Sequence, residues 1–140
     1  MHVLILGAAG MIGRKLTARL VADGNVGGRA VERLTLADVV PAERPAGADG
    51  EVRAVATDLA APGEAERLLE DRPDLIFHLA AVVSGEAEAD FDKGYRVNLD
   101  GTRALLDAVR AAHTADGYQP RLVVTSSIAV YGAPLPQPIP

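Results

Sequence analysis

The sequence predicts an α/β protein built on a doubly wound parallel sheet. Short apolar runs with strand character alternate with segments that have helical spacing. A glycine-rich run, residues 7–13, joins the first apolar run to the first helical segment. Residues 74–81 are apolar almost without interruption, which is typical of a parallel strand covered on both faces. Together these patterns indicate a Rossmann fold.

Composition limits the class of protein. With 140 residues, of which 49% are hydrophobic, the chain is long enough for one domain with a core. The net charge of -5, without a block of basic residues, disfavours binding to nucleic acid or to an anionic membrane. The absence of cysteine excludes disulfides, thiolate metal sites and cysteine nucleophiles.

Location and metal content follow from similar observations. The first residues lack the pattern of a signal peptide, and no apolar run could span a bilayer, so we expect a cytoplasmic protein. The three histidines are scattered and have no second ligand at metal spacing, so we expect no metal site.

The first strand, Val3 to Leu6, leads through the glycines into a helix predicted from Met11 to Asp23. Glycines at such a joint allow a sharp turn, a close approach of backbone N–H groups to a ligand, and tight helix packing. A pyrophosphate suits the free N–H groups of a helix start. The spacing is G-x-x-G-x-x-G, and a tight turn without ligand is the alternative. The predicted buried stripe of this helix is Ile12, Leu16, Leu20 and Val21.

A loop over residues 24–28 precedes a second predicted strand, residues 33–37, which ends at Asp38. A carboxylate there can accept both hydroxyls of an adenosine ribose, and it lies 25 residues after Gly13. It would also repel a 2′-phosphate, and Val39 follows it where an arginine would favour NADP, so the sequence favours NAD. The alternative is that Asp38 is a plain turn residue.

The third predicted strand, residues 52–56, follows a polar loop over residues 41–50. Ligands of doubly wound sheets lie beyond the carboxyl ends of the strands. Asp58 is therefore expected to meet an adenine amino group and Leu59 to lie beside the ring. Asp58 is equally well explained as a helix cap, and a short helix is predicted over residues 64–70.

The fourth strand and its exit, residues 74–81, end in the small residues Ala80 and Ala81, which allow a cofactor to approach the backbone. We interpret His78 as a core histidine. A long helix is predicted over residues 91–112, with Asn98 inside it, so its amide either points to solvent or bonds something specific.

The fifth predicted strand, residues 121–126, places Ser127 on the ligand side of the sheet. The alternative is that this serine only forms a turn at the strand end, through hydrogen bonds between its side chain and the nearby backbone. Residues 133–140 include four prolines and are predicted to form a loop.

These motifs, in this order, resemble those of the extended short-chain dehydrogenase/reductase family, which includes NAD-dependent sugar epimerases and dehydratases. The resemblance covers the whole chain. Residues 80–92 and 132–136 look like a branch of this family that oxidises small 2-hydroxy sugar acids at C2 to the 2-oxo acid. The resemblance implies a small-molecule substrate, NAD as cofactor and a homodimer formed through long helices.

The resemblance also implies roles for individual residues. Ser127 would be the catalytic serine, which hydrogen-bonds the reacting substrate oxygen, and Ser84 would contact substrate. Asn98 would serve structure and cofactor placement. The cofactor would be held by Gly7, Gly10, Met11, Ile12 and Gly13 at the pyrophosphate, Asp38 at the ribose, Asp58 and Leu59 at the adenine, and Leu79, Ala80, Ala81 and Val83 at the nicotinamide half.

One family feature is missing. The proton acceptor of the family is the tyrosine of a Tyr-x-x-x-Lys pair, but the residues four positions after Tyr95, Tyr118 and Tyr131 are all leucine. The resemblance places this pair and a substrate lobe beyond Pro140, so residues 1–132 would be an incomplete NAD-binding domain and residues 133–140 a loop leading onward. Two alternatives to the dehydrogenase remain: a nucleotide-sugar epimerase or dehydratase, and a noncatalytic dinucleotide-binding module.

Overall fold

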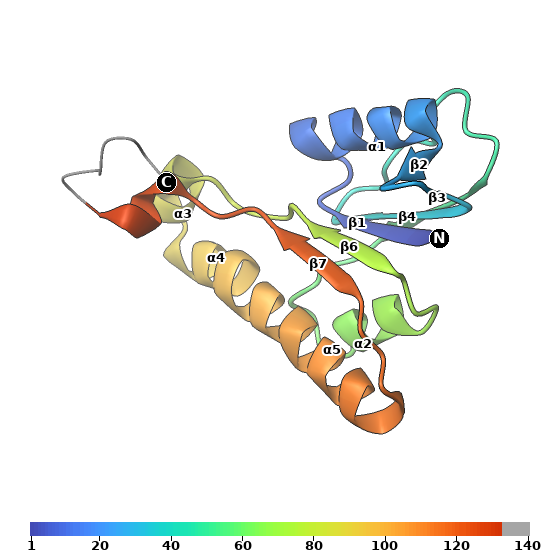
Figure 1. The fold of residues 1–140 in the computed structure, drawn as a ribbon. Coiled ribbons are helices and arrows are strands. Elements are labelled where there is room, and N and C mark those ends of the chain that lie inside the picture. The colour runs from blue at the N-terminus through green and yellow to red at the C-terminus, as the bar shows by residue number, and fades with distance from the viewer. Residues whose placement is uncertain (133–140) are drawn as a thin grey trace.

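The structure, a computed structural model, describes residues 1–132, and the predicted loop over residues 133–140 lies outside them. A five-stranded sheet has the order β5-β4-β1-β6-β7, and every pairing in it is parallel. This is the predicted doubly wound sheet, because the chain starts in the centre, builds one side, and then crosses to the other (Figure 1). The strands are β1 (His2–Leu6), β4 (Arg33–Asp38), β5 (Glu51–Ala56), β6 (Leu75–His78) and β7 (Arg121–Val124).

Helices cover both faces of the sheet (Figure 1). Helix α1 (Met11–Asp23) lies on one face, and α2 (Glu64–Leu69) and α5 (Thr102–Asp116) lie on the other. The central strand β1 serves both layers, because alternate side chains point to opposite faces. Val3 and Ile5 pack in the α1 layer, whereas Leu4 and Leu6 pack in the layer of α2 and α5, and all four are buried.

The predicted buried stripe of α1 is partly wrong. Ile12 is 52% exposed, and Gly13, Thr17 and Leu20 are the buried residues. Gly13 faces the sheet because its lack of a side chain allows the helix to approach the backbone of the glycine turn. Thr17 lies one turn further along the same face, where its hydroxyl donates a hydrogen bond to the carbonyl oxygen of Gly13 at 2.8 Å.

The segment predicted as a loop after α1 contains a small hairpin. Strands β2 (Asn25–Val26) and β3 (Arg29–Ala30) pair antiparallel. Gly27 and Gly28 connect them with φ angles of 57° and 80°, the left-handed conformation that tight two-residue hairpin turns require. Two-residue strands have no hydrophobic alternation, which explains why the sequence pattern indicated only a loop.

The predicted helix over residues 91–112 is not one regular helix. It consists of α4 (Phe91–Tyr95), a π-helical turn (Arg96–Gly101) and α5, which continues to Asp116. A further short helix, α3 (Ser84–Ala89), precedes it. None of the helices within residues 1–132 is long and apolar enough to cross a bilayer.

After β7 the chain leaves the body of the molecule and forms a short 3-10 turn at Ile128–Tyr131 (Figure 1). The predicted fifth strand is therefore shorter than expected, since it ends at Val124.

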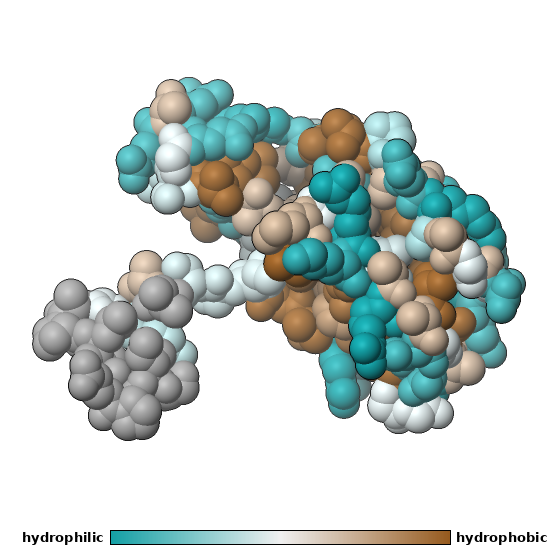
Figure 2. Space-filling model, turned by 90° about the horizontal axis from the view of Figure 1, so that it is seen from above, coloured by the Kyte–Doolittle hydropathy of each residue, from teal (hydrophilic) through white to brown (hydrophobic). Residues whose placement is uncertain are grey.

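Apolar side chains also remain visible among polar ones on the face shown in Figure 2. Val123 and Val124 of β7 are among the exposed apolar residues, with 41% and 45% of their surfaces accessible.

Candidate cofactor-binding site

A cleft of about 300 Å³ opens at the carboxyl ends of the strands, where β1 lies between β4 and β6. This is the point at which the strand order reverses, and open α/β sheets bind ligands there. The residues that line it come from the glycine turn, the segments after β4, β5 and β6, and the α3 to π-helix region. Eight of the residues predicted to bind the cofactor are among them: Gly7, Gly10, Asp38, Asp58, Leu59, Leu79, Ala80 and Ala81.

The glycine turn has the geometry of a phosphate cradle. Gly7 has a φ of +85°, and a Cβ atom on it would lie 2.6 Å from the backbone nitrogen of Ala80. A Cβ atom on Gly13 would lie 2.2 Å from the carbonyl oxygen of Gly7. Gly10 is the N-cap of α1 and offers no side-chain cap. The N–H groups of the first helical turn therefore remain available for an anion, and side chains do not fill the space beside them.

Asp38, the last residue of β4, lies at the rim of the cleft. Its Oδ2 atom accepts a hydrogen bond from the amide of Ala9 at 2.9 Å. The bond connects the end of β4 to the glycine turn, and the carboxylate keeps acceptor capacity for further donors. The side chain thus offers acceptor capacity at the rim of the cleft.

Asp58 does not cap a helix, since the N-cap of α2 is Gly63, but it caps a turn at the rim of the cleft. Its Oδ1 atom accepts a hydrogen bond from the amide of Ala60 at 3.1 Å, which caps the turn after β5. Its Oδ2 atom accepts a hydrogen bond from Arg96, and this bond holds the pKa of the Asp58 carboxyl below its usual range. Asp58 also lines the cleft, so capping and ligand contact are compatible.

The amide of Asn98 bonds a specific backbone segment, the second of the two alternatives above. Its Oδ1 atom accepts from the amide of Val82 at 2.8 Å, and its Nδ2 atom donates to the Val82 carbonyl at 3.0 Å. Val82 lies in the segment after β6 and lines the cleft. Asn98 therefore attaches this wall of the cleft to the π-helical turn.

His78, the last residue of β6, stabilises the π-helical turn. The side chain of His78 is buried, which confirms the prediction of a core histidine, and burial lowers its pKa. The Thr102 hydroxyl donates to the carbonyl oxygen of Asn98 at 2.9 Å and lies 2.8 Å from His78 Nε2. Since the hydroxyl proton is committed to Asn98, Nε2 carries the imidazole proton and donates it to Thr102. This chain of hydrogen bonds fixes the position of Asn98.

Other predicted site residues lie outside the lining of the cleft. Met11 and Ile12 are exposed in the first turn of α1 next to the glycine turn, and Val83 is 71% exposed. Ser84 lines a separate hollow with Phe91, Tyr95 and Leu99. Ser127 is exposed beyond β7, where its Oγ atom accepts a hydrogen bond from the amide of Ala129 at 3.2 Å.

Three charged residues that no sequence pattern indicated also line the cleft: Glu86, Lys93 and Arg96. Lys93 Nζ pairs with Glu86 Oε1 at 2.5 Å, and Arg96 pairs with Asp58. The i, i+3 spacing of Lys93 and Arg96 shows that they share a helix face, but not that this face borders a cleft. Within residues 1–132 no group of three potential ligands could hold a metal ion.

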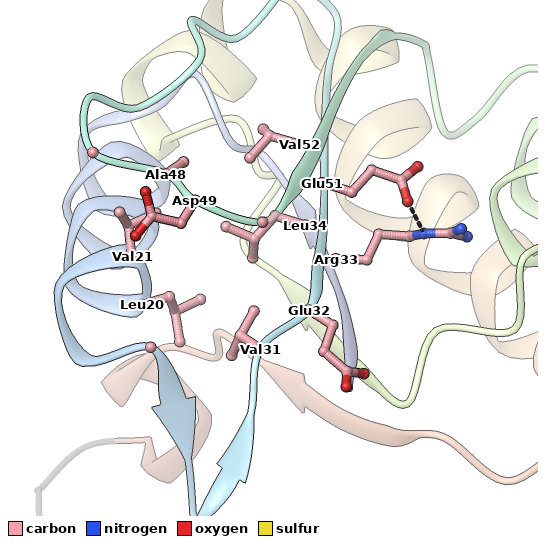
Figure 3. A pocket seen from close by; sticks show the side chains of 13 residues that line it. Leu20, Val21, Val31, Glu32, Arg33, Leu34, Ala48, Asp49, Glu51 and Val52 are labelled. Atoms are coloured by element: carbon pink, nitrogen blue, oxygen red, sulfur yellow. Dashed lines mark hydrogen bonds and ion pairs between the residues drawn. The ribbon is translucent and has the colours of Figure 1, made fainter.

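A smaller cavity of about 120 Å³ lies at the opposite edge of the sheet, near the amino ends of β4 and β5 (Figure 3). Leu20, Val31 and Leu34 form part of its apolar lining. The ion pair between Arg33 and Glu51, with 2.9 Å between Nε and Oε2, lies beside it. Glu32 and Asp49 also line it, so the cavity is partly polar.

Fold and cleft together define a dinucleotide-binding domain of the Rossmann type. Residues 3–140 match the model of the NAD dependent epimerase/dehydratase family, and the chain belongs to that family. NAD is the cofactor of this family. The cradle of glycines at the start of α1 and the carboxylate at the end of β4 fit this cofactor.

Individual relatives narrow the comparison. The chain is 49% identical to a D-erythronate dehydrogenase from Cupriavidus necator over 97% of its own length and 41% of that protein. A solved nucleoside-diphosphate-sugar epimerase from Agrobacterium tumefaciens is 69% identical, with a TM-score of 0.94 over 100% of this chain and 41% of that one. A uronate dehydrogenase from the same species, solved with NAD, is 32% identical, with a TM-score of 0.67 over 90% and 40% of the two chains. The chain thus spans about two fifths of the length of these relatives.

Proposed function

We propose that the native protein oxidises the 2-hydroxyl of a small sugar acid, of the D-erythronate type, to the 2-oxo acid. The observation that carries this proposal is the 49% identity to a D-erythronate dehydrogenase, which extends across the glycine turn, the cleft and the segment that contains Ser127. The likeness to a uronate dehydrogenase supports the same chemical class, because a uronate is also a sugar acid.

In this reaction C2 loses a hydride and its hydroxyl loses a proton, so that the alcohol becomes a ketone. NAD, when bound, accepts the hydride. The glycine turn and the start of α1 hold the pyrophosphate, and Asp38 holds the adenosine ribose. The Ser127 hydroxyl accepts one hydrogen bond from the amide of Ala129, and a hydroxyl in this state can donate its proton to the C2 oxygen. By the family resemblance, the proton acceptor is a tyrosine outside these 140 residues.

A nucleotide-sugar epimerase is the second candidate, favoured by the 69% identity to a protein described as a nucleoside-diphosphate-sugar epimerase. The two reactions differ in their products. The dehydrogenase releases NADH with each turnover, whereas an epimerase uses its NAD transiently and releases only an isomer of its substrate.

The deciding experiment incubates the native protein, purified at its natural length, with NAD and either D-erythronate or a nucleoside-diphosphate sugar. The proposal expects NADH, measured at 340 nm, and one equivalent of 2-oxo acid from D-erythronate. Isomerisation of the nucleotide sugar without net NADH would favour the second candidate. Tight NAD binding with neither product would favour a noncatalytic module.

Replacement of Asp38 tests the ribose contact. In Asp38→Ala we expect the Kd for NAD to rise about tenfold to a hundredfold, since hydrogen bonds to a charged acceptor contribute about 1.5–3 kcal/mol. The Kd for NADP should change less, because the carboxylate also repels a 2′-phosphate. Asp38→Asn is the matched control, because its amide oxygen can still accept from Ala9 N while the charge is gone. Unchanged affinities in a calorimetric titration would refute the ribose contact.

We also propose that the native protein forms a homodimer through α4 and the π-helical turn that follows it. An apolar stripe supports this: Phe91, Tyr95 and Leu99 are each more than half exposed and follow one another at helical spacing. The rings of Phe91 and Tyr95 are in contact, with centroids 4.5 Å apart and planes tilted by 35°. Large exposed apolar patches mark interaction surfaces.

A charge in the stripe should prevent dimer formation. For Phe91→Glu we expect sedimentation as a monomer, because pairing would bury the carboxylate in an apolar contact. Val40→Glu, which changes a half-exposed valine elsewhere on the surface, is the control and should sediment as the unmodified protein does. A dimer that persists in Phe91→Glu would place the interface elsewhere.

A further inference from the structure

Arg96 forms an ion pair with Asp58 across the cleft, and the stability of the fold does not explain it. The two residues belong to segments 38 positions apart, the π-helical turn and the turn after β5. Their side chains are 50% and 33% exposed. Ion pairs of this exposure contribute little to stability, about 0–1 kcal/mol.

The surrounding structure holds Arg96 at this place. The π-helical turn lies close to the segment after β5: a Cβ atom on Gly101 would be in ordinary van der Waals contact with the backbone nitrogen of Ala60, at 3.7 Å. Asn98, two residues after Arg96, bonds the segment after β6. One π-helical turn therefore contacts both walls of the cleft, and π-helical turns occur often at functional sites.

Each carboxylate oxygen of Asp58 accepts one hydrogen bond. Oδ1 accepts from the Ala60 amide, and Oδ2 accepts from Arg96. Each carboxylate oxygen can accept about two hydrogen bonds, so Asp58 keeps capacity for a donor that enters the cleft. The Arg96 bond fixes the orientation of the carboxylate and favours its charged form, which has only acceptor sites.

We propose that Arg96 is a positioning residue that orients Asp58 to accept a hydrogen bond from the 6-amino group of the adenine of NAD. The proposal rests on the proposed NAD site and adds a selectivity to it. Arg96 itself does not contact the adenine amino group, since a guanidinium has only donors and an amino group is also a donor. The preference of the site for adenine over a 6-oxo purine therefore depends on a residue that touches only the carboxylate.

The experiment compares NAD with nicotinamide hypoxanthine dinucleotide, in which a carbonyl replaces the 6-amino group. The Kd values of both are measured by calorimetry for the native protein, Arg96→Met, Arg96→Lys and the control Arg103→Met. Arg103 is another helical arginine that pairs with a carboxylate, Asp107, with 3.6 Å between Nε and Oδ2. Thermal unfolding of each variant reports whether it folds.

We expect the native protein and Arg103→Met to prefer NAD by about tenfold or more, the ratio that one hydrogen bond to a charged acceptor provides. In Arg96→Met the preference should fall below about threefold, mainly through weaker NAD binding, and Arg96→Lys should restore part of it. Equal weakening of both dinucleotides, or tighter NAD binding in Arg96→Met, would overturn the proposal. So would a native protein without the preference. Absence of NAD binding to the native protein would instead refute the NAD site itself.

Discussion

Gly13→Ala should lower the free energy of unfolding by about 2 kcal/mol or more, which is the magnitude expected when extra atoms are forced into a packed interior. The added Cβ atom would lie 2.2 Å from the Gly7 carbonyl oxygen and 2.7 Å from Ala8 Cα, distances that real Cβ contacts do not reach. Both contacts are with backbone, so no side chain can rotate away. The start of α1 must move away from β1 and disturb the phosphate cradle, so the Kd for NAD should rise at least tenfold, equivalent to about 1.4 kcal/mol.

The matched control is Gly85→Ala in α3, where a Cβ atom meets no atom within 4 Å. Alanine is the better helix former, so this variant should be as stable as the native protein or slightly more stable. Urea denaturation and NAD titration measure both quantities. If Gly13→Ala behaved like Gly85→Ala, the close packing of α1 on the glycine turn would be incorrect.

Sequence patterns predicted what depends on local repetition. The five strands of the main sheet, α1 and the carboxyl-end position of Asp38 and Asp58 follow from apolar runs, glycine spacing and the rule for open α/β sheets. The orientation of α1 was less predictable. Its apolar pattern placed Ile12 in the core, whereas the need for a glycine contact at Gly13 rotates Ile12 to the surface.

Features that depend on tertiary contacts could not be predicted in this way. The π-helical turn at Arg96–Gly101 differs from an α-helix in its hydrogen-bond spacing, but the residues in it are not distinctive of a π-helix. The Arg96 pair with Asp58 and the Asn98 bonds to Val82 connect segments far apart in the sequence. No periodicity indicates such contacts, so the charged side of the cleft became visible only in the structure.

Ser127→Ala should reduce kcat for sugar-acid oxidation by about a hundredfold to a thousandfold, the usual effect of removing one donor that stabilises charge on a reacting oxygen. The Kd for NAD should stay within about twofold, because Ser127 lies outside the lining of the cleft, and a twofold change in Kd corresponds to only about 0.4 kcal/mol. The loss of its cap bond to Ala129, 3.2 Å in an exposed turn, should cost at most about 1 kcal/mol of stability. A large fall in kcat with little change in NAD binding or stability would show that Ser127 is catalytic and does not serve only to form the turn.

Two further variants make the assignment specific. Ser127→Thr keeps the hydroxyl and should retain much of the activity, which a purely steric effect would not explain. Ser126→Ala removes the neighbouring hydroxyl, which is also exposed, and should leave kcat nearly unchanged. Steady-state kinetics on the native protein and the three variants decide the matter. If Ser126→Ala lost the activity and Ser127→Ala kept it, the reacting oxygen would be bound by the other hydroxyl; if neither mattered, the serines would serve only the turn after β7.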